Sequence, residues 1–203
     1  MLDRSLQARV EAAAGVLRRG GLVAYPTETF YGLGALASDA QAVSRVAAVK
    51  GRPDGKPLPL LAADLAAVEA VALLGPLARR LAGRLWPGAL TLVVPARPGL
   101  PPEIVAGTGA VGIRIPGSEL ARALARSAGG PIVSTSANLS GEPPVSRAAD
   151  LAPALRARLD AVLDAGSTPG GLPSTVVAVE EEAVRLLRAG VVPLEDVLRA
   201  ARA

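Results

Sequence analysis

The 203-residue chain contains no cysteine and no histidine. The absence of cysteine excludes disulfides, thiolate nucleophiles and cysteine-bound metals. The absence of histidine excludes histidine-based triads, the most common general base, and most zinc and iron sites. Any catalysis must therefore use carboxylates, lysine or arginine, hydroxyls, backbone amides, or a hard metal ion that arrives with its ligand.

Aromatic residues are also scarce, since the chain has only Tyr25, Phe30, Tyr31 and Trp86. Half of the residues are apolar, so the core must be built mainly from Ala, Val and Leu. The near absence of aromatics among the basic residues argues against stacking platforms for RNA bases. The net charge of +4 permits an anionic ligand or weak RNA binding without requiring either.

Long apolar runs are missing too, and no stretch approaches the length of a membrane span. The N-terminal residues lack the basic start and the apolar segment of a signal peptide. We therefore expect a soluble, cytoplasmic protein that does not contact a membrane.

Lysine is nearly absent, because Lys50 and Lys56 stand against twenty arginines and lie in one short stretch, residues 50–58. A lysine ammonium is a compact point charge that suits a phosphate approached end-on. With Arg52, three cations surround one loop that contains glycine and proline, which favours a polyphosphate clamp. Two alternatives are codon bias and cations that stabilise a helix C-terminus, an effect of roughly 0.3–1 kcal/mol.

Alternating helical and extended patterns predict an α/β domain with a mixed β-sheet flanked by helices. The expected helices are residues 5–19, a helix capped by Asp39, a helix capped by Asp64, residues 76–86, residues 118–128 and a C-terminal helix begun by Pro193. The expected strands are residues 22–25, 58–61, 89–94, 111–115, 132–134, 174–179 and 183–187. Residues 27–34 are expected to form a loop.

Polar residues gather where the predicted strands end, which is where ligands bind in α/β sheets. Thr27 and Thr29 offer hydroxyls and Glu28 offers a carboxylate, although the threonines could instead satisfy their own backbone. Arg114 faces away from its two isoleucine neighbours, so it lies either on a solvated face or in a concavity where it could hold a carboxylate. Residues 134–138 and 174–175 add hydroxyls and an amide, groups that also commonly form turns and caps.

In this order and spacing, the segments resemble the YrdC/TsaC family of threonylcarbamoyl-AMP synthases. The resemblance runs from residue 20 to residue 190 and includes a Lys-x-Arg and a Ser-x-Asn motif. The matching segments are residues 26–29 (PTET), 31–34 (YGLG), 50–53 (KGRP), 57–58 (PL), 86–88 (WPG) with Thr91, 114–116 (RIP), 136–138 (SAN) with Ser140 and Gly141, 174–176 (STV) and 188–190 (RAG).

The resemblance implies a reaction in which L-threonine, bicarbonate and ATP give threonylcarbamoyl-AMP and pyrophosphate. The product would serve transferase proteins that make N6-threonylcarbamoyladenosine at position 37 of tRNA. Mg²⁺ would arrive with ATP rather than in a dedicated metal site. The implied fold is a twisted α/β domain around a large basic cavity. We expect residues 1–203 to be the short, single-domain form, with no additional C-terminal domain.

The resemblance also implies roles for individual residues. The expected threonine-binding residues are Thr27, Arg114, Ser134 and Ser174. The expected ATP-binding residues are Lys50, Arg52, Asp54, Ser136, Asn138, Pro144 and Arg188, of which Lys50, Arg52, Ser136 and Asn138 are the expected catalytic set. Relatives commonly have a histidine after the Pro-Leu segment, where this chain has Leu61 and Ala62. The general base is not identified, and Glu28 is a candidate.

Two other functions compete with this hypothesis. The first is an RNA-binding module that uses the basic cavity without ATP turnover. The second is a carbamoyl-transfer domain like the one in hydrogenase maturation proteins, which would use carbamoyl phosphate.

Overall fold

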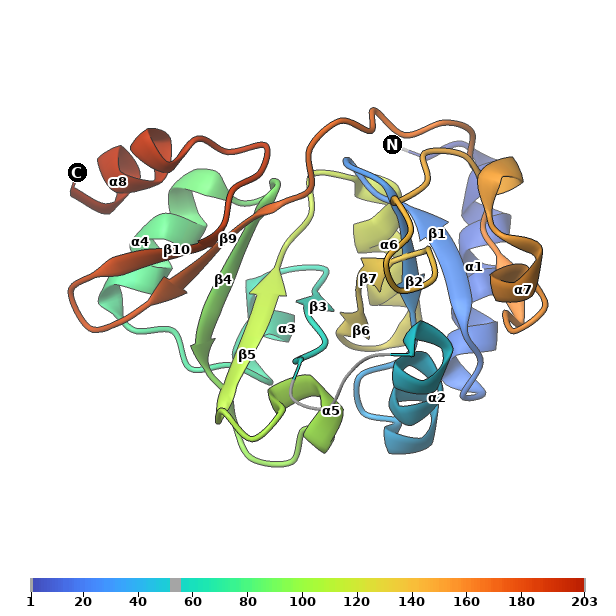
Figure 1. The fold of residues 1–203 in the computed structure, drawn as a ribbon, viewed down its shortest axis with the longest axis horizontal. Coiled ribbons are helices and arrows are strands. Elements are labelled where there is room, and N and C mark those ends of the chain that lie inside the picture. The colour runs from blue at the N-terminus through green and yellow to red at the C-terminus, as the bar shows by residue number, and fades with distance from the viewer. Residues whose placement is uncertain (1, 52–55, 203) are drawn as a thin grey trace.

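Two mixed β-sheets lie side by side, each with helices packed against it (Figure 1). The computed structural model describes residues 2–51 and 56–202. The four-stranded sheet has the order β7-β2-β1-β8 and consists of β1 (Val23–Pro26), β2 (Tyr31–Gly34), β7 (Thr135–Ser136) and β8 (Ala161–Val162). The six-stranded sheet has the order β10-β9-β4-β5-β3-β6 and consists of β3 (Leu60–Leu61), β4 (Leu90–Pro95), β5 (Ala110–Arg114), β6 (Ile132–Val133), β9 (Thr175–Val179) and β10 (Val184–Arg188).

The two sheets share one segment of chain, because β6 and β7 are separated by Ser134 alone. β6 pairs with β3 of the six-stranded sheet, whereas β7 pairs with β2 of the four-stranded sheet. The Ser134 N–H donates to the Pro59 carbonyl at 2.8 Å and fixes this crossing point. The α/β class predicted from the sequence is confirmed, but the expectation of one sheet is wrong because the chain changes sheets within a single residue.

Both faces of the four-stranded sheet are covered, and every residue of β1 and β2 is buried. On one face, α1 (Arg4–Arg18) and α6 (Glu119–Ala128) pack together around Val23 and Tyr25. On the other face, α2 (Ala40–Lys50) packs over Leu33. Residues 31–34 were expected to be a loop and instead form β2, whose backbone pairs with β1 and β7 on either side.

Side chains capping the helix N-termini explain where these helices begin. Asp3, Asp39 and Ser118 accept hydrogen bonds from backbone N–H groups of the first turns of α1, α2 and α6. α2 ends at Gly51, whose φ of 53° is the left-handed conformation that glycine adopts most readily.

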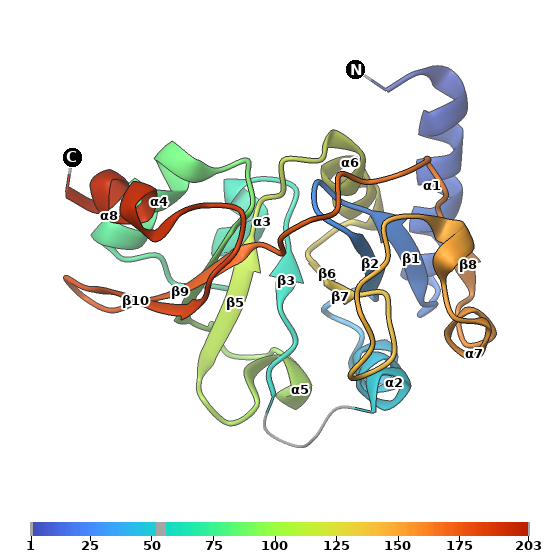
Figure 2. The same cartoon turned by 45° about the horizontal axis from the view of Figure 1, so that its top comes forward.

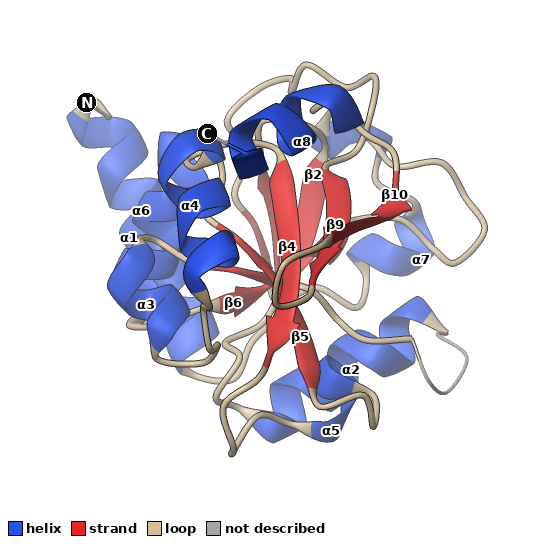
Figure 3. Ribbon diagram, turned by 90° about the vertical axis from the view of Figure 1, so that its left-hand side faces the viewer, coloured by secondary structure: helices blue, strands red, loops and turns tan. Residues whose placement is uncertain are grey.

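The six-stranded sheet has helices on one face, where α4 (Pro76–Leu85), α8 (Leu194–Arg202) and α3 (Leu65–Glu69) lie together (Figure 3). Leu90 and Leu92 of β4 are fully buried in the core on this side. On the opposite face, Val93, Gly112 and Val176 are only partly buried. This face is the one that is open to a ligand.

Three short helices complete the described elements: α5 (Pro102–Val105), a 3-10 helix (Ala148–Asp150) and α7 (Pro153–Arg156). Residues 163–174 then cross from the four-stranded to the six-stranded sheet (Figure 2). Backbone bonds from Thr168 to Ser146 and from Gly170 to Thr29, both 2.8 Å, hold this crossing segment. None of the described helices combines the length and hydropathy needed to cross a membrane.

Candidate active site

A cavity of about 1250 Å³ is lined by the open face of the six-stranded sheet, by residues of β2 and β7 in the four-stranded sheet, and by loops of both sheets. Its volume exceeds the roughly 300–1,000 Å³ typical of sites for one small molecule. Eight of the residues expected from the sequence line it: Thr27, Arg114, Ser134, Ser136, Asn138, Pro144, Ser174 and Arg188. Arg52 and Asp54 lie outside the described residues, and Lys50 is not among the described residues that line the cavity.

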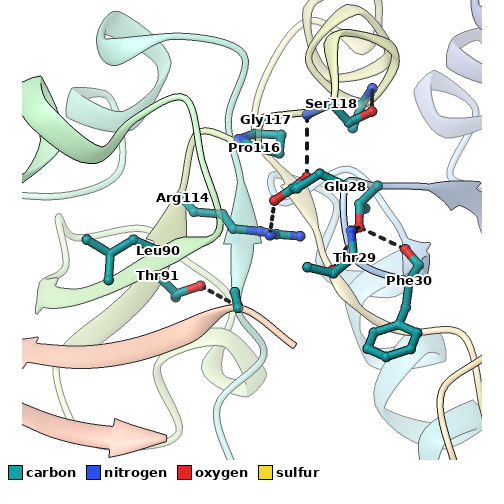
Figure 4. A network of polar contacts seen from close by, with 12 residues as sticks. Glu28, Thr29, Phe30, Leu90, Thr91, Arg114, Pro116, Gly117 and Ser118 are labelled. Atoms are coloured by element: carbon teal, nitrogen blue, oxygen red, sulfur yellow. Dashed lines mark hydrogen bonds and ion pairs between the residues drawn. The ribbon is translucent and has the colours of Figure 1, made fainter. Parts of the chain in front are cut away.

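Arg114 is the last residue of β5, and its guanidinium is paired with Glu28 from the loop between β1 and β2 (Figure 4). The Arg114 Nη1 group donates to Glu28 Oε1, and the two side chains are only 8% and 19% exposed. The second Glu28 oxygen accepts from the Ser118 N–H at 3.4 Å. Of the two environments considered for Arg114, the structure shows the concavity.

Thr27 is buried at the edge of the same cavity, and its hydroxyl bonds within its own turn. The hydroxyl donates to the Phe30 carbonyl at 2.8 Å and accepts from the Thr29 N–H at 3.2 Å. The alternative in which this threonine satisfies its own backbone is therefore confirmed. The same contacts fix Thr27 in place at the cavity wall.

Ser174 is held by two neighbours that also line the cavity. The Arg188 Nη2 group donates to the Ser174 carbonyl at 2.8 Å and to its hydroxyl at 3.0 Å. The Thr91 and Ser174 hydroxyl oxygens lie 3.0 Å apart. Thr91 belongs to a segment that matched the family pattern, but this contact could not be expected from the sequence, because the two residues are 83 positions apart in the chain.

An irregularity in the β9–β10 pairing explains why Arg188 faces the cavity. Leu186 pairs with Val177 and Arg188 pairs with Val176, so Leu187 is an extra residue in the ladder. Strict alternation would place Arg188 on the face opposite Arg185. The extra residue instead brings both arginines to the cavity side, as bulges commonly do near functional sites.

Lys50 is almost fully buried at the C-terminus of α2, where it anchors residues 136–138. Its Nζ donates to the Ser136 carbonyl at 2.8 Å, the Asn138 carbonyl at 2.5 Å and Asn138 Oδ1 at 2.9 Å. The Asn138 amide in turn donates to the Glu142 carbonyl, and the Ser136 hydroxyl donates to Asn138 Oδ1. The Lys-x-Arg and Ser-x-Asn motifs thus meet at Lys50, while Lys56 lines the cavity itself.

Two buried tyrosines beside these groups are excluded as general bases. Burial raises the pKa of Tyr25 to about 12. Burial and the nearby Asp164 carboxylate raise the pKa of Tyr31 to about 12. The Tyr31 hydroxyl donates towards Asp164 Oδ1 at 3.0 Å and the Gly166 carbonyl at 2.7 Å, which ties the crossing segment to β2.

The cavity also has an apolar part that the sequence analysis did not identify. It is formed by the half-exposed faces of β4, β5, β9 and β10, and its residues include Val93, Ala110, Gly112, Val176, Ala178 and Leu187. The sequence signal for this apolar part was strand alternation, which places every second residue of a strand on the same face of the sheet. Among residues 2–51 and 56–202, no cluster of three or more acidic side chains could hold a metal ion.

Comparison with known proteins gives a consistent result. A protein-family model for Sua5, YciO and YrdC, described as "Telomere recombination", matches residues 15–190. The chain is 42% identical over 193 residues to a threonylcarbamoyl-AMP synthase of Bacillus subtilis, covering 93% of this chain and 55% of the relative. It is 43% identical over 164 residues to a threonylcarbamoyl-AMP synthase of Stenotrophomonas maltophilia, covering 79% of this chain and 88% of the relative.

Among solved structures, P. abyssi Sua5 complexed with L-threonine superposes with a TM-score of 0.91 at 40% identity. That alignment covers 96% of this chain and 57% of the Sua5 chain. The present chain thus spans just over half the length of the Bacillus and P. abyssi relatives.

The two-sheet fold and the large cavity, with polar groups set in a partly apolar wall, define an α/β domain of the small-molecule-binding kind. The identity over nearly the whole chain makes the assignment more specific: the chain belongs to the Sua5/YciO/YrdC family.

Proposed function

We propose that this domain makes threonylcarbamoyl-AMP and pyrophosphate from L-threonine, bicarbonate and ATP. We propose further that the adenylate passes to a transferase that modifies adenosine 37 of tRNA and that the protein works in the cytoplasm. The observation that carries the proposal is the convergence of eight separately predicted residues on one cavity. The cavity volume, about 1250 Å³, supports the binding of an amino acid and a nucleotide together.

The amino-acid end of the cavity is assigned to Arg114, Thr27, Ser134 and Ser174. Arg114 presents a planar set of donors that suits the threonine carboxylate. The hydroxyls of Ser134 and Ser174 suit the polar groups of threonine because a hydroxyl can donate or accept. Thr27 is assigned to the wall of this end, since its hydroxyl already donates to the Phe30 carbonyl. The L-threonine complex of the P. abyssi relative supports threonine as the amino acid.

The nucleotide end is assigned to Ser136, Asn138, Pro144 and Arg188, together with Lys50 and the undescribed Arg52 and Asp54. Lys50 acts here by fixing residues 136–138, and Arg188 supplies a cation at the cavity wall. Mg²⁺ is assigned to the ATP that enters, because the described residues include no acidic cluster to hold the ion separately.

The chemistry has two steps. The neutral threonine amine condenses with bicarbonate to give a carbamate and water, and a carbamate oxygen then attacks the α-phosphorus of ATP, forming the adenylate as pyrophosphate leaves. Positioning of the two substrates and neutralisation of phosphate charge provide most of the acceleration in such transfers. A reaction that is accelerated mainly by positioning and by charge neutralisation suits a chain that has no histidine.

The test is pyrophosphate release by the purified protein, measured with all three substrates and with each one omitted. We expect release only in the complete mixture, with threonylcarbamoyl-AMP detected by mass spectrometry. We expect loss of release in Lys50→Ala and Arg52→Ala.

Two results would reject the proposal in favour of its competitors. Steeply salt-dependent RNA binding without any ATP turnover would indicate an RNA-binding module. Adenylate formation that requires carbamoyl phosphate and ignores threonine would indicate a carbamoyl-transfer domain.

A further inference from the structure

The ion pair between Glu28 and Arg114 differs from the other ion pairs among the described residues. It is the one pair in which both side chains are less than one fifth exposed. The Arg114 side chain lies at the end of β5 in the six-stranded sheet, and Glu28 follows β1 in the four-stranded sheet. The pair therefore spans the two sheets at the amino-acid end of the cavity.

The two partners face different surroundings. Arg114 lines the cavity, whereas Glu28 is not among the cavity-lining residues in the part of the chain that the structure describes. Glu28 lies between Arg114 and the start of α6, where its second oxygen accepts from the Ser118 N–H (Figure 4). A Cβ added at Gly117 would lie 3.5 Å from Glu28 Cγ, an ordinary van der Waals distance, so the Glu28 side chain lies alongside the backbone at Gly117.

This placement constrains the guanidinium that a substrate would meet. An arginine side chain has five N–H donors in a rigid plane, and a carboxylate that binds one of them fixes the direction of the others. Glu28 is itself held by the Ser118 N–H at the N-terminal end of α6, where negative charge is favoured. The remaining donors of Arg114 are thereby held in one orientation at the cavity wall.

We propose that Glu28 is a positioning residue that sets recognition of the amino-acid carboxylate by holding the Arg114 guanidinium. This inference rests on the proposed function, because it assigns the carboxylate of the amino-acid substrate to Arg114. It also replaces the candidate role of Glu28 as general base, since its carboxylate is bonded to Arg114 and to the Ser118 N–H rather than facing the cavity.

The test compares Glu28→Gln with wild type, using L-threonine and L-threoninol as the probes in binding calorimetry. Threoninol keeps the amine and both side-chain groups but lacks the carboxylate. We expect wild type to bind threonine much more tightly than threoninol. In Glu28→Gln we expect the ratio of the two affinities to shrink about tenfold, which corresponds to about 1.4 kcal/mol. Glu119→Gln, on the exposed face of α6, is the matched control and should keep the wild-type preference.

Kinetics separate positioning from catalysis. For Glu28→Gln we expect the KM for threonine to rise about tenfold, while kcat at saturating threonine stays within about threefold and its pH profile is unchanged. A collapse of kcat with a shifted pH profile would instead identify Glu28 as the base. An unchanged threonine preference would overturn the positioning role.

A second variant guards against a folding defect. Glu28→Asp keeps the charge that neutralises Arg114 but shortens the side chain by one methylene, so it should show the same change to a smaller degree. Circular dichroism and thermal unfolding confirm that each variant is folded.

The calorimetry also keeps this inference distinct from the proposed function. Threonine binding without adenylate formation would reject the function and still test Glu28. Wild-type protein that neither binds threonine nor forms adenylate would reject both.

Discussion

The two sheets contribute to the cavity in different ways. Every residue of β1 and β2 in the four-stranded sheet is buried, and helices cover both of its faces. The six-stranded sheet leaves one face open, and side chains of β4, β5, β9 and β10 line the cavity directly. The four-stranded sheet is thus a covered scaffold that reaches the cavity with parts of β2 and β7 and with its loops, whereas the six-stranded sheet lines the cavity with one open face.

This contrast gives an expectation for substitutions. Changes on the open face of the six-stranded sheet should act mainly on ligand binding. Changes beneath the four-stranded sheet should act through stability or through the position of a loop. Arg114 and Lys50 are the most informative residues, because each is a buried cation attached to one of the two sheets.

The largest effect is expected for Arg114→Ala. Removing the guanidinium deletes the proposed carboxylate site and leaves Glu28 largely buried without its partner. We expect kcat/KM for threonine to fall about a thousandfold, and the free energy of unfolding to fall by about 3–5 kcal/mol. Pyrophosphate release and urea unfolding measure the two effects. Arg126→Ala, on the exposed surface of α6, should change neither appreciably.

The next largest effect is expected for Lys50→Met, which keeps the aliphatic stem and removes the ammonium. Residues 136–138 lose three hydrogen bonds, so the nucleotide end of the cavity is no longer held. We expect kcat/KM for ATP to fall about a hundredfold and the free energy of unfolding to fall by about 2–3 kcal/mol. Equal loss in the control Arg45→Met, an exposed cation on the same helix, would contradict this anchoring role.

A smaller effect is expected for Thr91→Val, which removes one hydroxyl from the floor of the cavity at constant shape. The Ser174 hydroxyl loses its neighbour at 3.0 Å but keeps Arg188. We expect the KM for threonine to rise by about five- to tenfold, as for one lost hydrogen bond, with KM for ATP unchanged. Steady-state kinetics with each substrate varied will show whether the effect is confined to threonine, and exposed Ser44→Ala serves as the control.

The smallest effect is expected at Asp160, which directly precedes the edge strand β8 of the four-stranded sheet. A hydrogen bond from the Leu22 N–H, with a contribution from Arg45, holds the pKa of the Asp160 carboxyl below its usual value. A lowered pKa means that the ionised group stabilises the fold above pH about 4 and that this stabilisation is lost as the pH falls further.

We therefore expect Asp160→Asn to cost at most about 1 kcal/mol at pH 7, because the pair is largely exposed. The difference from wild type should disappear towards pH 3, with no change in threonine or ATP kinetics. Thermal unfolding at pH 7, 5 and 3 measures it. A difference in stability between wild type and Asp160→Asn that grows as the pH falls would contradict the lowered pKa of Asp160.

Local signals in the sequence predicted much of the fold. The caps at Asp39 and Asp64 and the apolar alternation of residues 89–94 correspond to α2, α3 and β4. β2 was missed because its sequence, Tyr-Gly-Leu-Gly, has the glycines of a loop, and only its pairing partners make it a strand. The second sheet was missed because two of its four strands, β7 and β8, are only two residues long and leave little signal in the sequence.

The candidate site was predicted as a set of residues but not as a set of contacts. The resemblance to the family implied the eight residues that line the cavity, and polar groups at strand ends were the local signal for several of them. The partners of Arg114 and Lys50 were not visible, since Glu28 lies 86 positions from Arg114 and Asn138 lies 88 positions from Lys50. The direction of Arg188 depends on the extra residue in β10, which alternation alone cannot reveal.

The one-residue passage at Ser134 has a mechanical consequence. The chain on either side of it belongs to a different ladder, so hinging the halves of the protein apart would strain the main-chain bonds of β6 or β7. We therefore expect substrate entry and product exit to depend on movements of side chains and surface loops rather than on separation of the two sheets.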